Sequence, residues 1–307
     1  MQDTRRGWQG LVILAAWLLA GTCHALEVKD DRGHVVQLAK PPQRVISLLP
    51  SLTESVCALG ACDRLVAVDK WSNWPRSVQQ LPKSGAMEDA NVELLVSLRP
   101  DVVLVAQSSK LAERLEALGL KVMAFEAKTR ADIPRVLNTL APMFPGSQPA
   151  KVWREIEATT AAAQQSVGAR LKGQRVYFEV SDAIYAAGAS SFIGELMGGF
   201  GLQNVVPAEL GPFPKINPEF VVRANPQWIL HSGARTGKLQ QRPGWSRLAA
   251  FQPAKGGRDQ VCAFPRESYE VLIRPGPRMG EAAQILARCL NGQMTQPASP
   301  THPTGMD

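Results

Sequence analysis

The sequence predicts an α/β protein with two similar lobes, each built on a parallel sheet, joined by one long α-helix. Three observations support this prediction. Apolar strands alternate with amphipathic helices in both halves of the chain. One phrase occurs twice, as NVELLVSLRPDVVLVA at 91–106 and as NPEFVVRANPQWILHS at 217–232. A long helical stretch without strands separates the two halves.

The first half is expected to contain a hairpin and then strand–helix pairs. Residues 26–43 alternate apolar and polar positions around an Asp-Arg-Gly turn, which is typical of an antiparallel hairpin. Strands are expected at RVISLLP, RLVAV, DVVLVA and KVMAF, and helices at SLTESVCALGAC, VELLVSL and LAERLEALG. Ser51 and Glu54 have capping-box spacing, which predicts that the first of these helices starts there and ends near Gly60.

Between residues 129 and 173 no strand is expected. Apolar residues recur there on one helical face, which predicts a single amphipathic helix of roughly 25 residues. They are Val152, Ile156, Ala163, Val167 and Leu171. RVYFEV then starts the second lobe as RVISLLP starts the first, with further strands at QWILHS and VCAFP and helices at SFIGELMGGFG, PEFVVRA and 280–290.

The repeated phrase puts one Glu at the same place in each lobe. In both copies the Glu, Glu93 or Glu219, opens a short amphipathic helix, and a Pro follows seven residues later. The Pro cannot continue the helix and is expected to hold the residue before it, Arg99 or Asn225, in extended geometry. The alternative is that each carboxylate only stabilises its own helix, because a negative charge at a helix N-terminus interacts favourably with the helix dipole. That interaction contributes about 0.3–1 kcal/mol.

The N-terminus has the layout of a secretory signal peptide. Two arginines precede an apolar run at 11–20, and small residues follow up to Ala25. The run is too short for a membrane span. Residues 1–25 are therefore expected to be removed on export to the periplasm, with lipidation at Cys23 as the alternative.

Export changes how the four remaining cysteines are interpreted. An even number in an oxidising compartment indicates disulfides, and four cysteines allow three pairings. Sequence order favours Cys57 with Cys62 and Cys262 with Cys289, although Cys57 also suits a small buried apolar position. The spacings do not match a zinc site, so no protein-bound metal and no cofactor are expected.

Composition and motifs disfavour two functional classes. The 34 basic and 27 acidic residues give a net charge of +7, but they are scattered rather than grouped with aromatic residues. Nucleic acid is therefore not an expected partner. The chain lacks the G-x-S-x-G, H-E-x-x-H, P-loop and dinucleotide-binding signatures, so an enzyme is the less favoured interpretation.

These elements divide the chain into five parts. Residues 1–25 form the signal peptide, 26–144 the N-terminal lobe, 145–173 the linking helix and 174–290 the C-terminal lobe. Residues 291–307 are rich in Pro, Ser, Thr and Gly and are expected to be a disordered tail.

Several of these segments together resemble the periplasmic binding proteins of cobalamin and iron-complex ABC importers. They are PQRVISLLPSLTESVCALGACDRLVAV, both copies of the repeated phrase, the long helix and RPGPR at 274–278. WSNWP at 71–75 is most similar to the cobalamin-binding branch. The resemblance covers residues 43–290 and implies a rigid helical bridge, a small hinge motion and a ligand held between the lobes.

The resemblance also implies which aromatic residues line the ligand cleft. They are Trp71, Trp74, Phe213 and, as a weaker candidate, Tyr185. Flat aromatic faces suit a large, partly apolar macrocycle, so cobalamin is the expected ligand, with heme or a ferric siderophore as the alternative. Packing of Trp74 into the core is the alternative for that residue. Another Trp of the cobalamin binders corresponds to Met87 here, a departure from that branch.

The same resemblance implies functions for four charged residues. Arg274 and Arg278 are implied at the cleft, where a guanidinium group can pair with an acidic group of the ligand. For Arg278 the alternative is bonding to carbonyl groups of its own loop. Glu93 and Glu219 are implied to dock into arginine pockets of a permease dimer in the inner membrane, one from each lobe of a monomer. A signalling adaptor that senses the ligand would share these features.

Overall fold

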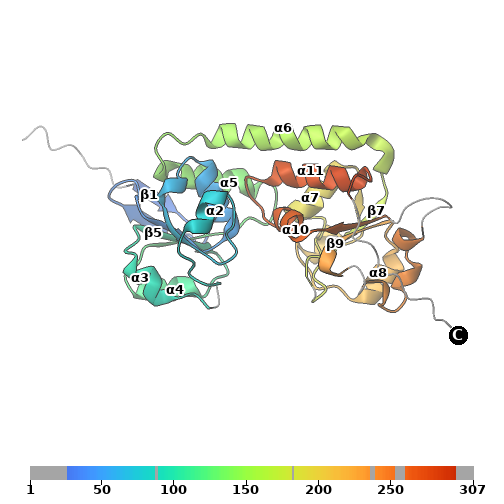
Figure 1. Ribbon diagram of the computed structural model, residues 1–307, viewed down its shortest axis with the longest axis horizontal. Helices are drawn as coiled ribbons and strands as arrows, with labels where there is room; N and C mark the ends of the chain where they lie inside the picture. Colours follow the sequence, from blue (N-terminus) through green and yellow to red (C-terminus); the bar gives the residue numbers. More distant parts are fainter. Residues whose placement is uncertain (1–25, 87–88, 182, 236–238, 253–259, 295–307) are drawn as a thin grey trace, which may run out of the picture.

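The computed structural model describes residues 26–86, 89–181, 183–235, 239–252 and 260–294 of the 307-residue chain. Two lobes lie side by side, and helix α6 (Pro149–Val167) runs across both along one edge (Figure 1). The predicted fold, two α/β lobes joined by one long helix, is confirmed. The expected signal peptide, Met87 and most of the expected tail lie outside the described residues.

The N-terminal lobe contains a four-stranded parallel sheet. Its strands are β3 (Val45–Ser47), β4 (Leu65–Val68), β5 (Val102–Ala106) and β6 (Val122–Phe125). Its helices are α2 (Pro50–Ala58), α3 (Val92–Ser97), α4 (Leu111–Ala117) and α5 (Asp132–Leu140). Every residue of β3, β5 and β6 is buried, as expected of a parallel sheet covered on both faces.

The C-terminal lobe repeats this plan. Its strands are β7 (Arg175–Phe178), β8 (Gln203–Asn204), β9 (Trp228–Ser232) and β10 (Val261–Phe264). Its helices are α7 (Phe192–Gly199), α8 (Pro218–Ala224), α10 (Arg266–Leu272) and α11 (Met279–Leu290). The sheet orders are β4-β3-β5-β6 and β8-β7-β9-β10, so in both lobes the first strand lies between the second and the third. The repeat in sequence is a repeat of topology.

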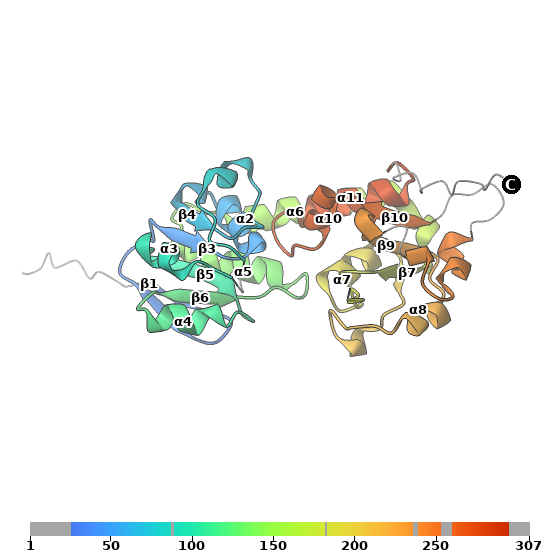
Figure 2. The ribbon, with the colours of Figure 1, turned by 60° about the horizontal axis from the view of Figure 1, so that its bottom comes forward.

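Helix α6 is shorter than the sequence pattern predicts. It spans 19 residues, and the chain leaves helical geometry at Gly168, where φ is 68°. Leu171, expected on the same helix, belongs to a separate short 3₁₀ helix. Helix α11 lies along α6 (Figures 1 and 2). A Cβ atom at Gly280 would lie 2.8 Å from Cβ of Thr159, so the close approach of these helices requires glycine.

Two local predictions are wrong at helix ends. Arg99 and Asn225 precede proline but adopt left-handed φ values of 46° and 43° rather than extended geometry. Each closes its helix through its backbone N–H, Arg99 to the carbonyl of Val96 and Asn225 to that of Val221, both at 3.0 Å. Satisfying a terminal carbonyl in this way is a common helix ending, and here it outweighs the preference imposed by proline.

The predicted capping box is also wrong. Helix α2 starts at Pro50, and its N-cap residue, Leu49, makes no side-chain cap hydrogen bond. Glu54 instead points into the protein and is only 1% exposed. The predicted end of the helix is confirmed, since α2 stops at Ala58 and Gly60 follows with φ of 81°.

Both predicted disulfides are present. Cys57 and Cys62 join the end of α2 to the turn that precedes β4. Cys262 and Cys289 join β10 to α11. The second bridge fixes the sheet of the C-terminal lobe to the helix that packs on α6.

A buried carboxylate fastens the N-terminal hairpin, β1 (Leu26–Lys29) and β2 (Val35–Leu38), to the first lobe. Asp30 accepts the backbone N–H groups of Arg32 and His34 at 2.9 Å and of Ala124 in β6 at 3.0 Å. Burial by itself would raise the pKa of Asp30, but the Ala124 N–H and Arg32 together bring it below its ordinary value.

Replacing Asp30 with asparagine is expected to lower the free energy of unfolding by about 2 kcal/mol at pH 7, because the amide loses the charge that these donors stabilise. A lowered pKa stabilises the folded state above the unfolded pKa, and this contribution disappears as pH falls through the folded value, below about 4. Urea unfolding should therefore show a smaller difference between wild type and Asp30→Asn at pH 3. Asp63→Asn, at an exposed carboxylate, is the control. An equal difference at both pH values would contradict this assignment.

Candidate functional site

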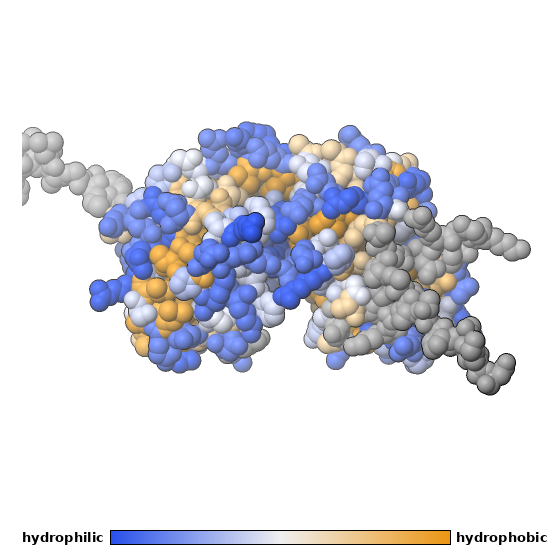
Figure 3. All heavy atoms as spheres, viewed as in Figure 1, coloured by the Kyte–Doolittle hydropathy of each residue, from blue (hydrophilic) through white to orange (hydrophobic). Residues whose placement is uncertain are grey.

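The surface is hollowed between the two lobes on the side away from α6 (Figure 3). Trp71 lies at this lobe boundary, in the loop that follows β4, and is 50% exposed. Its ring centre is 5.3 Å from Nζ of Lys70 and 5.9 Å from the guanidinium carbon of Arg266, which belongs to α10 of the other lobe. A large aromatic ring is thus partly open to solvent where both lobes meet.

The other aromatic candidates occupy different surroundings. Trp74 is 38% exposed, and its ring centre is 5.0 Å from the guanidinium carbon of Arg278. Tyr185 follows β7 and is 42% exposed. Phe213 is half-buried, with its ring centre 5.8 Å from that of Phe192 in α7.

The loops that carry Tyr185 and Phe213 run beside each other. Tyr185 forms an isolated antiparallel bridge with Lys215, and the N–H of Ala186 donates to the carbonyl of Pro214. Ile184 adopts a φ of 62°, which is strained for a β-branched residue. The backbone on both sides of Tyr185 is therefore closely constrained. The same pair of loops carries the exposed ring of Tyr185 and the half-buried ring of Phe213.

Arg274 joins the two lobes through its guanidinium group and is only 8% exposed. Nη1 donates to Oε1 of Glu54 at 3.1 Å and to Oδ1 of Asn73 at 2.8 Å. Nη2 donates to the carbonyl of Trp71 at 3.0 Å and to Oε2 of Glu270 at 3.1 Å. Glu54, Trp71 and Asn73 belong to the N-terminal lobe, and Glu270 lies on α10.

Arg278 is also engaged within the protein. Nε and Nη2 each donate to one carboxylate oxygen of Glu281 at 2.8 Å, and Nη1 lies 3.7 Å from Oε1 of Glu54. The predicted alternative, bonding to its own loop carbonyls, is not what these contacts show. Direct ligand contact by Arg274 or Arg278 would require either side chain to leave its present partners.

Glu54 is the buried carboxylate between these two arginines. Burial raises its pKa, and the positive charges of Arg274 and Arg278 oppose this only in part. Its buried role was not predicted from the sequence, because the spacing to Ser51 indicates a helix cap. The available signal was that Glu54 is the only charged residue of α2, since a carboxylate that is buried needs a charged partner.

A second polar cluster holds the Trp71 loop from the N-terminal side. Buried Asp69 accepts the N–H groups of Trp71 at 2.7 Å and Ser72 at 3.1 Å through Oδ1, and the Ser72 hydroxyl at 2.5 Å through Oδ2. The Ser72 hydroxyl lies 2.9 Å from the hydroxyl of Thr53, and the Thr53 hydroxyl donates to that of Ser47 at 2.8 Å. Burial raises the pKa of Asp69, against the effect of the Ser72 hydrogen bonds.

Glu93 and Glu219 lie at equivalent places in the two lobes. Both are exposed at the second residue of their helices, α3 and α8. An asparagine precedes each helix as its N-cap, with Asn91 accepting the N–H of Leu94 and Asn217 that of Glu219 at 2.9 Å. The predicted helix-terminal setting of both carboxylates is confirmed.

Equivalent arginines fix these two helices to the sheets. Nε and Nη2 of Arg44 donate to the carbonyl of Leu98 at 2.9 and 2.7 Å. The same atoms of Arg175 donate to the carbonyl of Asn225 at 3.1 and 3.0 Å. In the sequence these arginines are recognisable only as the first residues of RVISLLP and RVYFEV. Because each arginine binds a carbonyl at the end of its helix, α3 and α8 are held in the same way, and the two glutamates have equivalent supports.

The described residues contain neither a metal-binding cluster nor a membrane-spanning helix. Within that part of the chain, His, Cys, Asp and Glu form no group of three or more that could hold a metal ion. None of the described helices combines the length and hydrophobicity needed to cross a bilayer.

Two topologically equivalent lobes, a helical bridge and aromatic side chains at the lobe boundary define a two-lobed ligand-binding protein. A family model described as periplasmic binding protein matches residues 45–255. The chain therefore belongs to the periplasmic binding protein family. Members of this family bind ligands outside the cytoplasm and are not enzymes, which confirms the predicted class of function.

Known relatives match along most of the chain. It is 25% identical over 314 residues to an uncharacterized ABC transporter substrate-binding lipoprotein, YvrC, of Bacillus subtilis, covering 93% of this chain and 97% of that protein. It is 27% identical over 267 residues to a vitamin B12-binding protein of Pectobacterium atrosepticum, covering 84% and 92%. The fold is similar to that of the periplasmic heme-binding protein RhuT from Roseiflexus sp. RS-1, with a TM-score of 0.68, 21% identity, and coverage of 82% and 98%.

Proposed function

We propose that this protein is the substrate-binding component of an ABC importer and captures cobalamin or a related corrinoid between its lobes. The observation that carries the proposal is the position of Trp71, half exposed at the lobe boundary. A corrinoid is a large, flat and partly apolar macrocycle, and an exposed aromatic face offers it contact area at low entropic cost. The vitamin B12-binding relative, similar over 84% of this chain, supports the same ligand class.

The proposed cleft takes aromatic residues from both lobes. Trp71 and Trp74 come from the loop after β4, and Tyr185 and Phe213 come from the paired loops of the second lobe. In open parallel sheets, ligands bind at the carboxyl ends of strands, where these loops lie. Arg274 and Arg278 act at this boundary mainly as supports, because both Nη groups of Arg274 and Nε and Nη2 of Arg278 already donate to protein acceptors.

Heme or a ferric siderophore is the second candidate. The cations of Lys70 and Arg266 near the Trp71 ring favour it, since they suit a ligand with acidic groups at its edge. The likeness in fold to a heme-binding protein is compatible with this alternative but does not distinguish the ligands.

A ligand panel tests the proposal. Residues 26–307 would be titrated with cobalamin, heme and ferric siderophores while intrinsic tryptophan fluorescence is recorded. We expect cobalamin to quench the fluorescence at micromolar concentration, because Trp71 and Trp74 lie at the proposed cleft. Free tryptophan at the same absorbance controls for inner-filter loss. Binding of a siderophore or heme, with no response to cobalamin, would show that the corrinoid assignment is wrong.

We further propose that Glu93 and Glu219 dock the protein onto a membrane permease dimer. A monomer with two equivalent lobes presents one carboxylate per lobe, and a two-fold symmetric permease offers two equivalent basic sites. The matching N-caps and arginine supports of α3 and α8 favour this role over two unrelated helix-terminal acids.

Replacing both Glu93 and Glu219 with alanine is expected to weaken association with the permease more than either single change, while ligand affinity stays unchanged. Binding to the detergent-solubilised permease, measured by biolayer interferometry, would show the loss. Glu113→Ala is a matched control, since Glu113 is also exposed in the first turn of a helix in the N-terminal lobe. A large loss of ligand affinity in either single variant would instead move that residue into the cleft.

The proposal includes export and the division of the chain. Residues 1–25 are proposed to be removed as a signal peptide, with delivery to the periplasm. The lobes are proposed as 26–144 and 174–290, with 145–173 between them.

A further inference from the structure

We propose that Arg274 is a positioning residue that holds the Trp71 loop of the first lobe against the second lobe, so that the ligand-facing ring and the lobe boundary move as one unit. This inference rests on the proposed ligand site at Trp71 but not on which macrocycle binds there. It gives Arg274 a different role from direct contact with the ligand.

The loop that carries Trp71 belongs to one lobe, but its polar groups reach the other. The carbonyl of Trp71 and Oδ1 of Asn73 both accept hydrogen bonds from Arg274. Nδ2 of Asn73 donates to Oε2 of Glu270 on α10 at 2.7 Å. Three hydrogen bonds therefore join residues 71 and 73 to the second lobe, all through Arg274 and Glu270.

The same residue is held from the opposite side by its own lobe. The N–H of Trp71 donates to Asp69, which is fixed in turn by Ser72 and, through it, Thr53. The peptide group before the Trp71 side chain is thus bound to Asp69 of the N-terminal lobe. The peptide group after it is bound to both lobes, through the Ser72 N–H to Asp69 and through the Trp71 carbonyl to Arg274. A change in the relative position of the lobes would therefore pull on the peptide group beside the ring through Arg274, against the hold of Asp69.

The contacts of Arg274 explain why it acts through Trp71. Its two Nη atoms carry four hydrogens and have four protein acceptors, on Glu54, Asn73, Trp71 and Glu270. Glu54 is buried and accepts from the same Nη1 atom that donates to Asn73, so it helps to orient the guanidinium group toward the loop. A group whose Nη donors are all engaged orders its neighbours rather than recognising a ligand.

Fluorine NMR of the ligand-free protein tests the positioning directly. Two of the seven tryptophans lie within residues 1–25, so 5-fluorotryptophan labelling of residues 26–307 gives five signals, and Trp71→Phe identifies that of Trp71. We expect Arg274→Ala to shift or broaden the Trp71 signal and to leave that of buried Trp245 unchanged. Asn73→Ala should act on the same signal while keeping the Arg274–Glu54 pair, so it decides the question even if Arg274→Ala does not fold. An unchanged Trp71 signal in Asn73→Ala would overturn the proposal.

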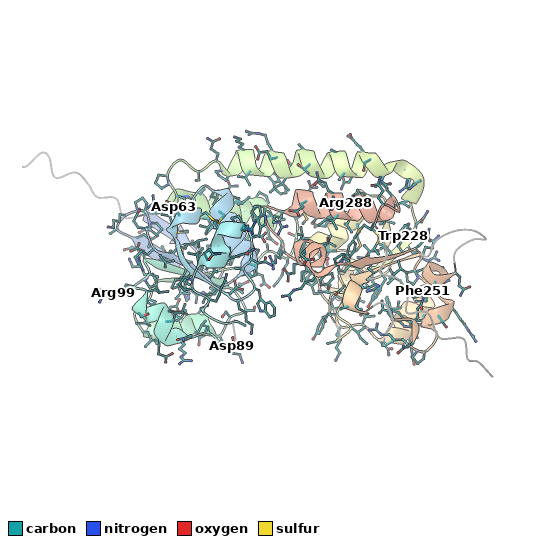
Figure 4. The ribbon with its side chains drawn as sticks, viewed as in Figure 1. Asp63, Asp89, Arg99, Trp228, Phe251 and Arg288 are labelled. Carbon is teal, nitrogen blue, oxygen red and sulfur yellow. A yellow bond between two sulfur atoms is a disulfide. The ribbon has the colours of Figure 1, made fainter. Side chains whose placement is uncertain are left out.

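A double-mutant cycle then separates positioning from ligand contact, with cobalamin as the probe. If Arg274 acts through Trp71, the double variant Arg274→Ala/Trp71→Ala binds no more weakly than Trp71→Ala alone. If the double variant instead loses affinity by the product of the two single losses, Arg274 contacts the ligand independently of Trp71. That result would overturn the proposal. Arg288→Ala, at an exposed arginine of α11 (Figure 4), is the control. If wild type does not bind cobalamin, the proposed corrinoid ligand fails, while the fluorine signals still decide the role of Arg274.

Discussion

Replacing Arg274 with alanine is expected to lower the free energy of unfolding by about 3–5 kcal/mol, because the change leaves a buried carboxylate without its partner. Glu54 is 1% exposed, and Arg274 is its hydrogen-bonded cation at 3.1 Å. The remaining cation, Arg278, lies 3.7 Å away and is bound to Glu281. Urea unfolding at pH 7, followed by circular dichroism, would measure the loss.

Two further variants isolate the cause of that loss. Arg278→Ala removes a pair with half-exposed Glu281 and the more distant of the two cations beside Glu54, so it should cost less than Arg274→Ala. Adding Glu54→Gln to Arg274→Ala should recover part of the stability, because the unpaired buried charge is gone. Equal losses in Arg274→Ala and Arg278→Ala, with no recovery in the double variant, would contradict a buried ion pair at this boundary.

Replacing Trp71 with alanine is expected to weaken binding of the macrocycle about tenfold or more. Covering one face of an aromatic ring removes on the order of 50–100 Å² of apolar surface from water, worth roughly 1–2.5 kcal/mol. A partly hydrated cation beside the ring, such as Arg266, contributes about 1 kcal/mol or less and is screened by salt. Calorimetric titration at moderate ionic strength would compare the two contributions.

Trp153 provides the matched control for Trp71. It belongs to α6, the helix that runs along the edge away from the hollow. Trp153→Ala should leave ligand affinity unchanged, and Phe213→Ala should resemble Trp71→Ala if the second lobe supplies the other wall. The opposite ranking of Arg266→Ala and Trp71→Ala would contradict this expectation. If Arg266→Ala abolishes binding while Trp71→Ala has little effect, the ligand is an anionic chelate held mainly by charge.

Most of the fold could be predicted from local patterns in the sequence. Strand and helix periodicities act over a few residues, so RVISLLP, DVVLVA and their counterparts in the second half could be assigned without knowing their neighbours. The duplicated phrase then predicted two lobes, and both sheets have the same strand order. The same local reasoning failed at Arg99 and Asn225, where closing a helix end mattered more than the following proline.

The candidate site could be predicted only in part, because its supports come from distant segments. Trp71 was identified through a resemblance, but the residues that hold it were not. Glu54 and Arg274 are 220 positions apart in sequence, and Asn73 and Glu270 are 197 apart. Their contacts depend on how the two lobes meet, which no periodicity or spacing within one segment encodes.

Calorimetric titration of cobalamin into residues 26–307 tests the central claim most directly. We predict that one cobalamin binds per chain at micromolar concentration or below. The heat capacity change should be negative, since apolar surface is buried between the lobes. Absence of cobalamin binding at micromolar concentration, in a protein whose circular dichroism and cooperative unfolding show that it is folded, would contradict the account.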